Sequence, residues 1–186
     1  MQAHPAPAAD PLLHFNDEVL AQALALVAAH ARPEGPRLAG PAGAHLRHII
    51  EHHEALVFPA TPGVVDYDSR LRDRRVETQP AMAAQRLQAL RAALGAWQAH
   101  SLSLPVRVQG LAGSTGELSF AVESTRGREL AFVASHAVHH FALLRTHCQA
   151  LGLALPTHFG VAPATVAHQL KPTATETRCA PSLQAA

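Results

Sequence analysis

Histidines at helical spacing are the residues of this sequence best suited to chemistry. The chain has 14 histidines in 186 residues; four lie between His45 and His53, and three lie between His136 and His140. On a helix, His136 and His140 are separated by about 40° in azimuth and by one turn in height. Two imidazoles at this spacing can reach a single ion at ~2.0–2.1 Å each. The pair therefore predicts two ligands of one metal site.

A third ligand has to come from the earlier histidine cluster, which falls on a separate helix. His45 and His52 share one face of that helix, and His48 is offset from His45 by roughly 60°. Any of the three can supply a third nitrogen if the two helices pack side by side. His139 lies about 60° to the other side of His136 and points less well toward the same spot. Three imidazoles leave a coordination position for water or substrate, as catalytic metal sites do.

The competing interpretation is that His136 and His140 are buried core residues with ordinary hydrogen-bond partners. Their helix is apolar on nearly every side, so we expect it to be central and buried, where an unpartnered imidazole is costly. Other metal motifs are disfavoured by the sequence. The segment from His136 to His140 lacks the Glu of HExxH. The chain has no Glu followed three residues later by His, which a ferritin-like di-iron centre needs, and no Cys-x-x-Cys-His.

Apolar periodicity and capping signals place the histidines on two of four predicted helices. The helices are expected from Asn16, as N-cap, to about Ala31, from Pro41 to the residue before Pro59, from Pro80 through a core stripe of Leu87, Leu90, Leu94 and Trp97, and from about Arg128 to Leu151. Residues 104–110 and 117–123 alternate apolar and polar positions and predict a short β-hairpin or an extended crossover. The predicted fold class is therefore mainly α.

One compact domain is expected from the chain length. Residues 1–13 are rich in Pro and Ala and are predicted to be disordered. Residues 14–158 form the predicted helical domain, and residues 159–186, which are interrupted by prolines, form a loosely ordered tail.

Composition bears on compartment and partners. The formal charge is +1, from 15 basic and 14 acidic residues without a basic stripe, so neither nucleic acid nor a membrane surface is an expected partner. The first ten residues lack the features of a secretory signal, and no run approaches the ~18 apolar residues of a membrane helix. Cys148 and Cys179 suggest neither a disulfide framework nor a thiolate site. A cytoplasmic protein is expected.

A charged segment between Val65 and Glu77 is the second candidate for chemistry. Arg70 or Arg72 can clamp a substrate carboxylate, because a guanidinium recognises it bidentately. Tyr67 can donate a proton near a metal. The alternative is a surface loop tied by its own ion pairs.

Together, the two histidine segments resemble the DinB/YfiT-like metalloenzyme superfamily, the DinB family. The resemblance covers roughly residues 16–155 and rests on His45-Leu-Arg-His48-Ile-Ile-Glu-His52-His53 and on Ser135-His136-Ala-Val-His139-His140-Phe-Ala-Leu-Leu. It implies a four-helix bundle with a long crossover that binds one divalent transition metal ion (Zn, Ni, Fe or Mn) through three histidines. Carried over by position, these ligands are His48, His136 and His140. The family's frequent Arg-Gly-Gln after the last ligand is replaced by Phe141-Ala142-Leu143, so no role is carried over there.

The resemblance also implies a metal-dependent enzyme that activates a low-molecular-weight thiol or water, in the manner of a transferase or a hydrolase. We expect a small-molecule substrate, a homodimer, and no cofactor besides the metal. His52, Tyr67, Arg70, Arg72 and His139 are the catalytic or substrate-binding candidates, whereas His45 and His53 are expected to be partly exposed. Two alternatives stay open: a non-catalytic metal-binding or sensing bundle, and a metal-free bundle that acts through partners.

Overall fold

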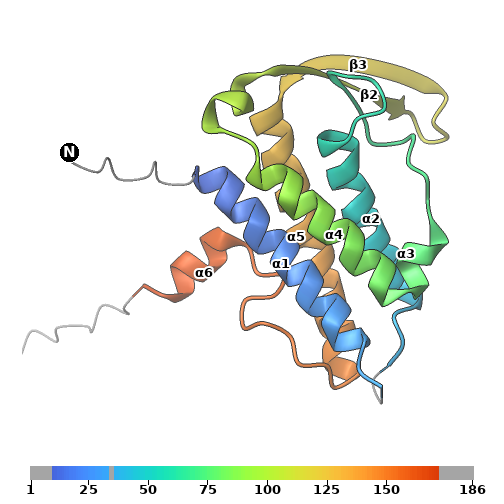
Figure 1. Ribbon diagram of the computed structural model, residues 1–186, viewed down its shortest axis with the longest axis vertical. Coiled ribbons are helices and arrows are strands. Elements are labelled where there is room, and N and C mark those ends of the chain that lie inside the picture. Colours follow the sequence, from blue (N-terminus) through green and yellow to red (C-terminus); the bar gives the residue numbers. More distant parts are fainter. Residues whose placement is uncertain (1–9, 34–35, 172–186) are drawn as a thin grey trace, which may run out of the picture.

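The computed structural model of the chain describes residues 10–33 and 36–171 and is mostly helical, with a three-stranded sheet at one end (Figure 1). Its elements are the helices α1 (Pro11–His30), α2 (Gly40–Val57), α3 (Arg74–Thr78), α4 (Pro80–Gly95), α5 (Arg126–Ala150) and α6 (Pro163–Gln169), a 3-10 helix η1 (Ala99–Ser103), and the strands β1 (Val64–Asp66), β2 (Pro105–Ala112) and β3 (Leu118–Thr125). The prediction of a mainly α fold is confirmed.

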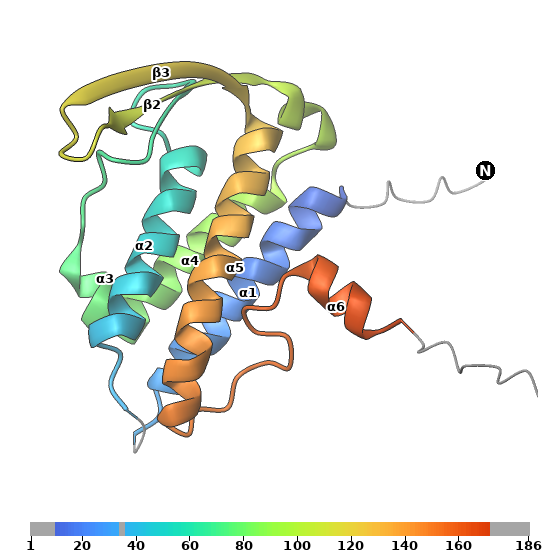
Figure 2. The ribbon, with the colours of Figure 1, turned by 180° about the vertical axis from the view of Figure 1, so that it is seen from behind.

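The long helices α1, α2, α4 and α5 enclose the core. α2 packs along α5, α4 packs against α1 and α2, and α1 also contacts α5 (Figure 2). The core is almost entirely aliphatic, as the low aromatic content requires, and its fully buried large side chains include Leu20, Leu26, Leu46, Ile49, Ile50, Leu87, Leu90, Leu130 and Phe141. The predicted burial of the stripe on α4 is therefore confirmed for its three leucines. Trp97 lies just beyond the helix and is partly buried against the core.

The sheet closes one end of the helical layer. β2 and β3 form an antiparallel hairpin, and β1 adds to β2 in parallel, with Val65 opposite Val108 and Val108 opposite Val122. Val65 and Val108 are buried, so β1 and β2 extend the core. The predicted hairpin is confirmed, whereas β1 was not expected because three residues are too short to show an alternating pattern.

The first helix begins earlier than predicted. Asp10 is the N-cap, and its carboxylate accepts hydrogen bonds from the backbone N–H groups of Leu12 and Leu13 at 2.9 and 3.4 Å. Pro11 takes the first helical position, which suits its missing N–H. Asn16, the predicted cap, lies buried inside the helix and donates to the Leu12 carbonyl. The Asp-Pro pair was the stronger start signal.

The ends of the chain are described only in part. The expected disorder of residues 1–13 is wrong at residues 11–13, which are helical. Residues 1–9 lie outside the part of the chain that the structure describes. Within the expected loose tail, Phe159 is buried against Phe141 and α6 forms a short exposed helix. Residues 172–186 lie outside the description.

The expectation that the last long helix is buried all round is wrong. Phe132 is 36% exposed and Leu143 is 52% exposed, and His139 also faces outward. One side of α5 is therefore open, because α2 and α1 cover only the opposite faces.

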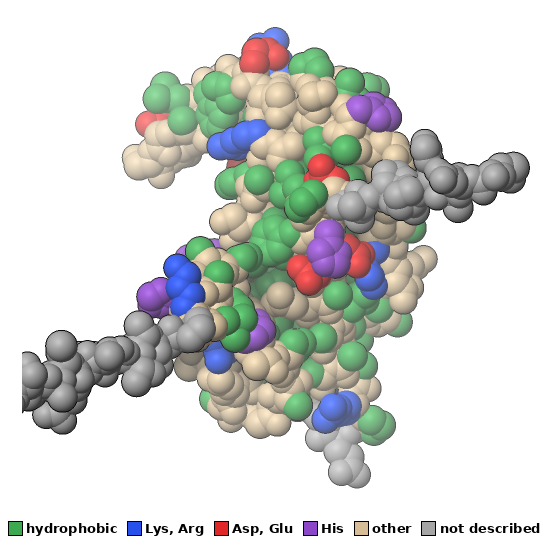
Figure 3. All heavy atoms as spheres, turned by 90° about the vertical axis from the view of Figure 1, so that its left-hand side faces the viewer, with side chains coloured by type: hydrophobic (Ala, Val, Ile, Leu, Met, Phe, Trp, Pro, Cys, Tyr) green, Lys and Arg blue, Asp and Glu red, His purple; other side chains and the backbone are tan. Residues whose placement is uncertain are grey.

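Among the residues that the structure describes, one helix, α1, is long and apolar enough to cross a membrane by length and composition alone. Its Val19, Leu20 and Leu26 are fully buried in the core. Its outward side is polar, since Asp17 binds Arg91 of α4 through two hydrogen bonds. Figure 3 shows acidic, basic and histidine side chains mixed with hydrophobic ones on that side of the molecule. The pattern is that of a core helix.

Replacing Gly43 tests the contact that positions the charged segment on α2. A Cβ at Gly43 would collide with the carbonyl oxygen of Glu77 in α3, whereas a Cβ at Gly95 would meet open space. We expect Gly43→Ala to lower the free energy of unfolding by about 2 kcal/mol through overpacking. Gly95→Ala, the matched control, should be neutral or stabilising by up to about 1 kcal/mol. Urea unfolding measures both, and equal effects would contradict the packing described.

Candidate metal centre

Three imidazoles from two distant segments converge between α2 and α5. Nε2 of His48 lies 2.8 Å from Nε2 of His136, and Nε2 of His140 lies 3.1 Å from the same atom. One ring nitrogen of each residue lies within 4.8 Å of the others. Nitrogens bound tetrahedrally to one ion at ~2.0–2.1 Å are separated by roughly 3.3 Å. The nitrogen–nitrogen distances between the predicted ligands are thus close to those that a shared ion requires.

The helix backbones hold these rings at fixed positions. Ile49 and Ile50 of α2 are buried directly after His48, and Ala134 and Ala137 of α5 are buried on either side of His136. Buried alanines add no bulk between helices, so α5 can lie close to α2. The ring positions therefore follow from core packing rather than from a mobile loop.

Burial keeps the three ligand candidates neutral. It is the main cause that lowers the pKa of His48 to about 3 and that of His140 to about 4, and neighbouring histidines add to the effect. The pKa of His136 is lowered for the same reason. Neutral imidazole is the form that binds metal ions. At neutral pH, all three rings therefore have the charge state that metal binding requires.

In His48 and His140, the two outer rings, the Nδ1 atom that points away from the other ligands contacts a polar side chain. Nδ1 of His45 lies 2.6 Å from Nδ1 of His140, and a guanidinium nitrogen of Arg70 lies 2.8 Å from Nδ1 of His48. Phe132 stacks on the ring of His136 at 5.5 Å between centroids. Each ring of the trio formed by His48, His136 and His140 therefore has a neighbour that restricts its rotation.

His52 is a fourth ring beside the trio. Its Nδ1–H donates to the carbonyl oxygen of His48 at 2.8 Å, so its Nε2 carries a lone pair. Its ring centroid lies 4.8 Å from that of His136, and burial lowers its pKa to about 4. His139 is exposed, and its ring lies 5.6 Å from that of His140. Of these two candidates, the structure brings His52 to the site and leaves His139 at its rim.

Tyr67 faces a buried carboxylate rather than the trio. Its hydroxyl donates to Glu129 at 2.8 Å, and Glu129 also accepts from Ser124 and Arg128 at 2.7 and 2.8 Å. Burial and the Glu129 carboxylate raise the pKa of Tyr67. Its ring stacks on that of His52, with 12° between the planes. The ring of Tyr67 therefore orients His52, and the hydroxyl of Tyr67 donates its hydrogen bond to Glu129.

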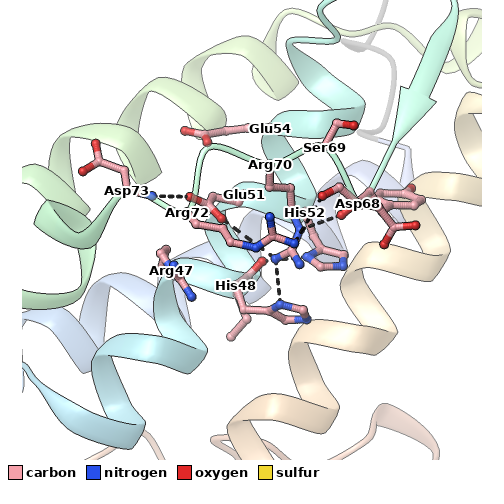
Figure 4. A network of polar contacts seen from close by, with 12 residues as sticks. Arg47, His48, Glu51, His52, Glu54, Asp68, Ser69, Arg70, Arg72 and Asp73 are labelled. Carbon is pink, nitrogen blue, oxygen red and sulfur yellow. Dashed lines mark hydrogen bonds and ion pairs between the residues drawn. The ribbon is translucent and has the colours of Figure 1, made fainter. Parts of the chain in front are cut away.

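The charged segment is fastened to α2 rather than only to itself. The backbone N–H of Asp73 donates to Glu51 at 2.9 Å, and Arg70 reaches back to His48 (Figure 4). The internal pair between Asp73 and Arg75 is present as well. Arg72 is exposed, adopts a positive φ of 50° and donates to the Asp68 carbonyl at 3.5 Å. Arg70 belongs to the site, and Arg72 lies outside it.

His53 is buried, contrary to the expected partial exposure. It has 0% exposure, its Nδ1–H donates to the Ile49 carbonyl, and its Nε2 has no partner among the described residues. The sequence could have predicted this burial, because His53 continues the helical spacing of the core residues Leu46, Ile49 and Leu56. Glu51 and Glu129 were missed as well, since isolated acidic residues give no pattern that predicts burial.

A cavity of about 400 Å³ adjoins the site on the side of Arg70. Its wall combines charged and apolar side chains, among them Glu51, Glu54, Phe58, Asp66, Arg70 and Arg86. Glu54 and Arg86 neutralise each other by a bidentate pair. Arg70 both lines this cavity and contacts a ring of the trio.

Comparison with known proteins gives little further guidance. No family model matches the sequence, and no solved structure matches it. FK506-binding protein 5 of Rhizopus delemar is 31% identical over 118 residues, which are 62% of this chain and 31% of that protein. The chain thus spans about a third of the length of this curated relative.

Burial of His53 predicts a pH-dependent stability. Its pKa of about 4 in the folded protein, lowered mainly by burial, lies below the value of 6.5 in the unfolded chain. Between these values the unfolded chain binds more protons, so stability present above pH 6.5 is lost as the pH falls toward 4. In His53→Leu the slope should decrease by about 1.4 kcal/mol per pH unit in this window. Urea unfolding of chelator-treated protein measures it, and an unchanged slope would contradict burial.

Proposed function

We propose that the chain is a metal-dependent enzyme in which His48, His136 and His140 bind one divalent transition metal ion. The observation that carries this proposal is the convergence of their ring nitrogens, all within 4.8 Å of one another, from two helices whose residues His48 and His136 are 88 positions apart in sequence. A hydrogen bond between neutral imidazoles joins two nitrogens, whereas here Nε2 of His136 lies within 3.1 Å of both other Nε2 atoms. This is the main argument against the metal-free alternative.

The donor set fits such an ion. Imidazole nitrogen suits Zn, Fe and Ni, and burial holds the three rings neutral at pH 7. Three protein ligands leave room for a further one, as in catalytic sites. A bound divalent ion would lower the pKa of a thiol or water beside it and so supply a nucleophile at neutral pH.

The surrounding residues suggest how a substrate is handled. His52 presents an unprotonated Nε2 beside the trio and is placed to accept a proton, with Tyr67 stacked on it. Arg70 offers a guanidinium between the trio and the cavity, where it can pair with a substrate carboxylate. We infer a small-molecule substrate, with a low-molecular-weight thiol as the class that the family resemblance favours, and a transferase or hydrolase reaction.

The DinB-like assignment is part of the same proposal. The four long helices, with α3 and the sheet in their connections, are compatible with a four-helix bundle that has a long crossover. We further propose a homodimer and a cytoplasmic location. The name of the Rhizopus delemar protein concerns FK506 binding, and nothing of it is carried over to this chain.

The alternative function is metal binding or sensing without catalysis. The trio alone is equally compatible with both functions. The cavity and the free Nε2 of His52 favour catalysis, because a sensor needs neither a substrate space nor a base.

Metal content tests the ligand set. We expect close to one Zn, Ni, Fe or Mn ion per chain in the purified or reconstituted protein. His136→Ala should lose it, because two imidazoles remain. His139→Ala, on the same helix but outward, should retain it. Elemental analysis gives the stoichiometry, with circular dichroism as the check on folding. Metal absent from the wild type after reconstitution, or retained in His136→Ala, would refute the site.

Thiol binding separates the enzyme from the sensor. Because an open position is expected at the ion, glutathione should change the visible spectrum of the cobalt-substituted protein and add a thiolate-to-cobalt band. S-methylglutathione, which lacks the free thiol, serves as the control and should not. A spectrum that responds to neither compound would favour the sensing alternative.

A further inference from the structure

The guanidinium of Arg70 lies between His48 and Glu51, as Figure 4 shows. Its NH1 is 2.8 Å from Nδ1 of His48 and 3.9 Å from Oε2 of Glu51, and its Nε donates to the Tyr67 carbonyl at 2.5 Å. The Arg70 side chain is only 13% exposed. Its position is therefore set by these few polar contacts.

The contact with Arg70 fixes the proton of His48. Arginine has donors and no acceptor, so a hydrogen bond to it makes Nδ1 of neutral His48 the acceptor and leaves the proton on Nε2. This tautomer also explains the 2.8 Å separation between the Nε2 atoms of His48 and His136, which is then a hydrogen bond. A neutral imidazole that binds a metal through Nε2 must instead carry its proton on Nδ1. Two donors would then face each other at 2.8 Å.

The corresponding contact at the other outer ligand has no such conflict. Nδ1 of His140 faces Nδ1 of His45 at 2.6 Å, and either ring nitrogen can donate or accept. When His140 binds through Nε2, its Nδ1–H can donate to His45, in the way that metal-bound histidines usually donate to a neighbour. Of these two ligands, only His48 has the conflict.

Glu51 provides the alternative partner for Arg70. Its Oε1 accepts from the backbone of Asp73, but its Oε2 is buried and has no hydrogen-bond partner among the described residues. The side chain is 2% exposed, and a buried oxygen without a partner is costly. A shift of NH1 by roughly 1 Å would bring it to the 2.7–2.9 Å typical of a charge-assisted hydrogen bond.

We propose that Arg70 competes with the metal for His48 and that metal binding transfers its guanidinium to Glu51. This inference rests on the proposed metal site and assigns a residue that tunes it. In the metal-free protein, Arg70 holds His48 in the non-binding tautomer; in the loaded protein, it satisfies Oε2 of Glu51. Because Arg70 also lines the cavity, metal loading changes the cavity wall, and a carboxylate that draws Arg70 away from His48 strengthens metal binding.

The tautomer of His48 in the metal-free protein is the first test. Nitrogen-15 NMR of the labelled, chelator-treated full chain, assigned with His48→Gln, should show the Nε2–H tautomer and its conversion to Nδ1–H on addition of zinc. A proton on Nδ1 of His48 before zinc is added would overturn the proposal. This reading needs no metal, so it can fail while the metal site itself stands.

A double-mutant cycle with zinc affinity as the readout is the second test. Arg70→Met should tighten zinc binding by about tenfold, since it removes a charged hydrogen bond that competes with the ion. Glu51→Gln should weaken zinc binding in the wild type but not in the Arg70→Met background. Arg47→Met removes the same charge from the position beside His48, where Arg47 pairs with Glu77 at 3.1 Å, and should have a much smaller effect.

Three outcomes would overturn the competition. Weaker zinc binding in Arg70→Met would mean that Arg70 stabilises the metal-bound form. An equal effect of Glu51→Gln on zinc affinity in both backgrounds would mean that Glu51 acts through its negative charge and not through Arg70. Absence of zinc binding from every variant would remove the proposed function as well, and the metal-free NMR spectrum would still report the tautomer of His48.

Discussion

The packing of α2 against α5 is the constraint on which the site depends. It places Nε2 of His48 and Nε2 of His136 at 2.8 Å, a separation at which two lone pairs repel unless a proton or a metal ion lies between them. The aliphatic core and the buried alanines of α5 set this distance. The fold therefore keeps the two imidazoles close together, and a proton or, as we propose, a metal ion between them relieves the repulsion.

Around this centre, polar groups are fastened by residues that lie far away in the chain. The segment between β1 and α3 crosses α2, places Arg70 on His48 and satisfies one oxygen of Glu51. On the other side, Glu129 holds Tyr67, which stacks on His52. The residues around the trio are thus each held by a second contact, as the partners of metal-binding histidines commonly are.

The sequence predicted those features that leave a periodic or local signal. The helices of the histidines, the core leucines of α4 and the hairpin follow from spacing and turn residues, and the pair at His136 and His140 follows from helix geometry. Long-range pairings could not be predicted in this way. The contact of Arg70 with His48 and the burial of Glu51 and Glu129 depend on how a segment without periodicity folds back over α2. The cap at Asp10 does leave a local signal, because Pro11 follows it at the first helical position.

The most direct test of the central claim is X-ray absorption spectroscopy of the zinc-loaded protein. We expect a first shell with three imidazole nitrogens at ~2.0–2.1 Å, visible as the outer-shell scattering of histidine rings. That scattering should fall by about one ring in His48→Ala. A first shell of oxygen or sulfur without imidazole scattering, or a spectrum unchanged by His48→Ala, would contradict it.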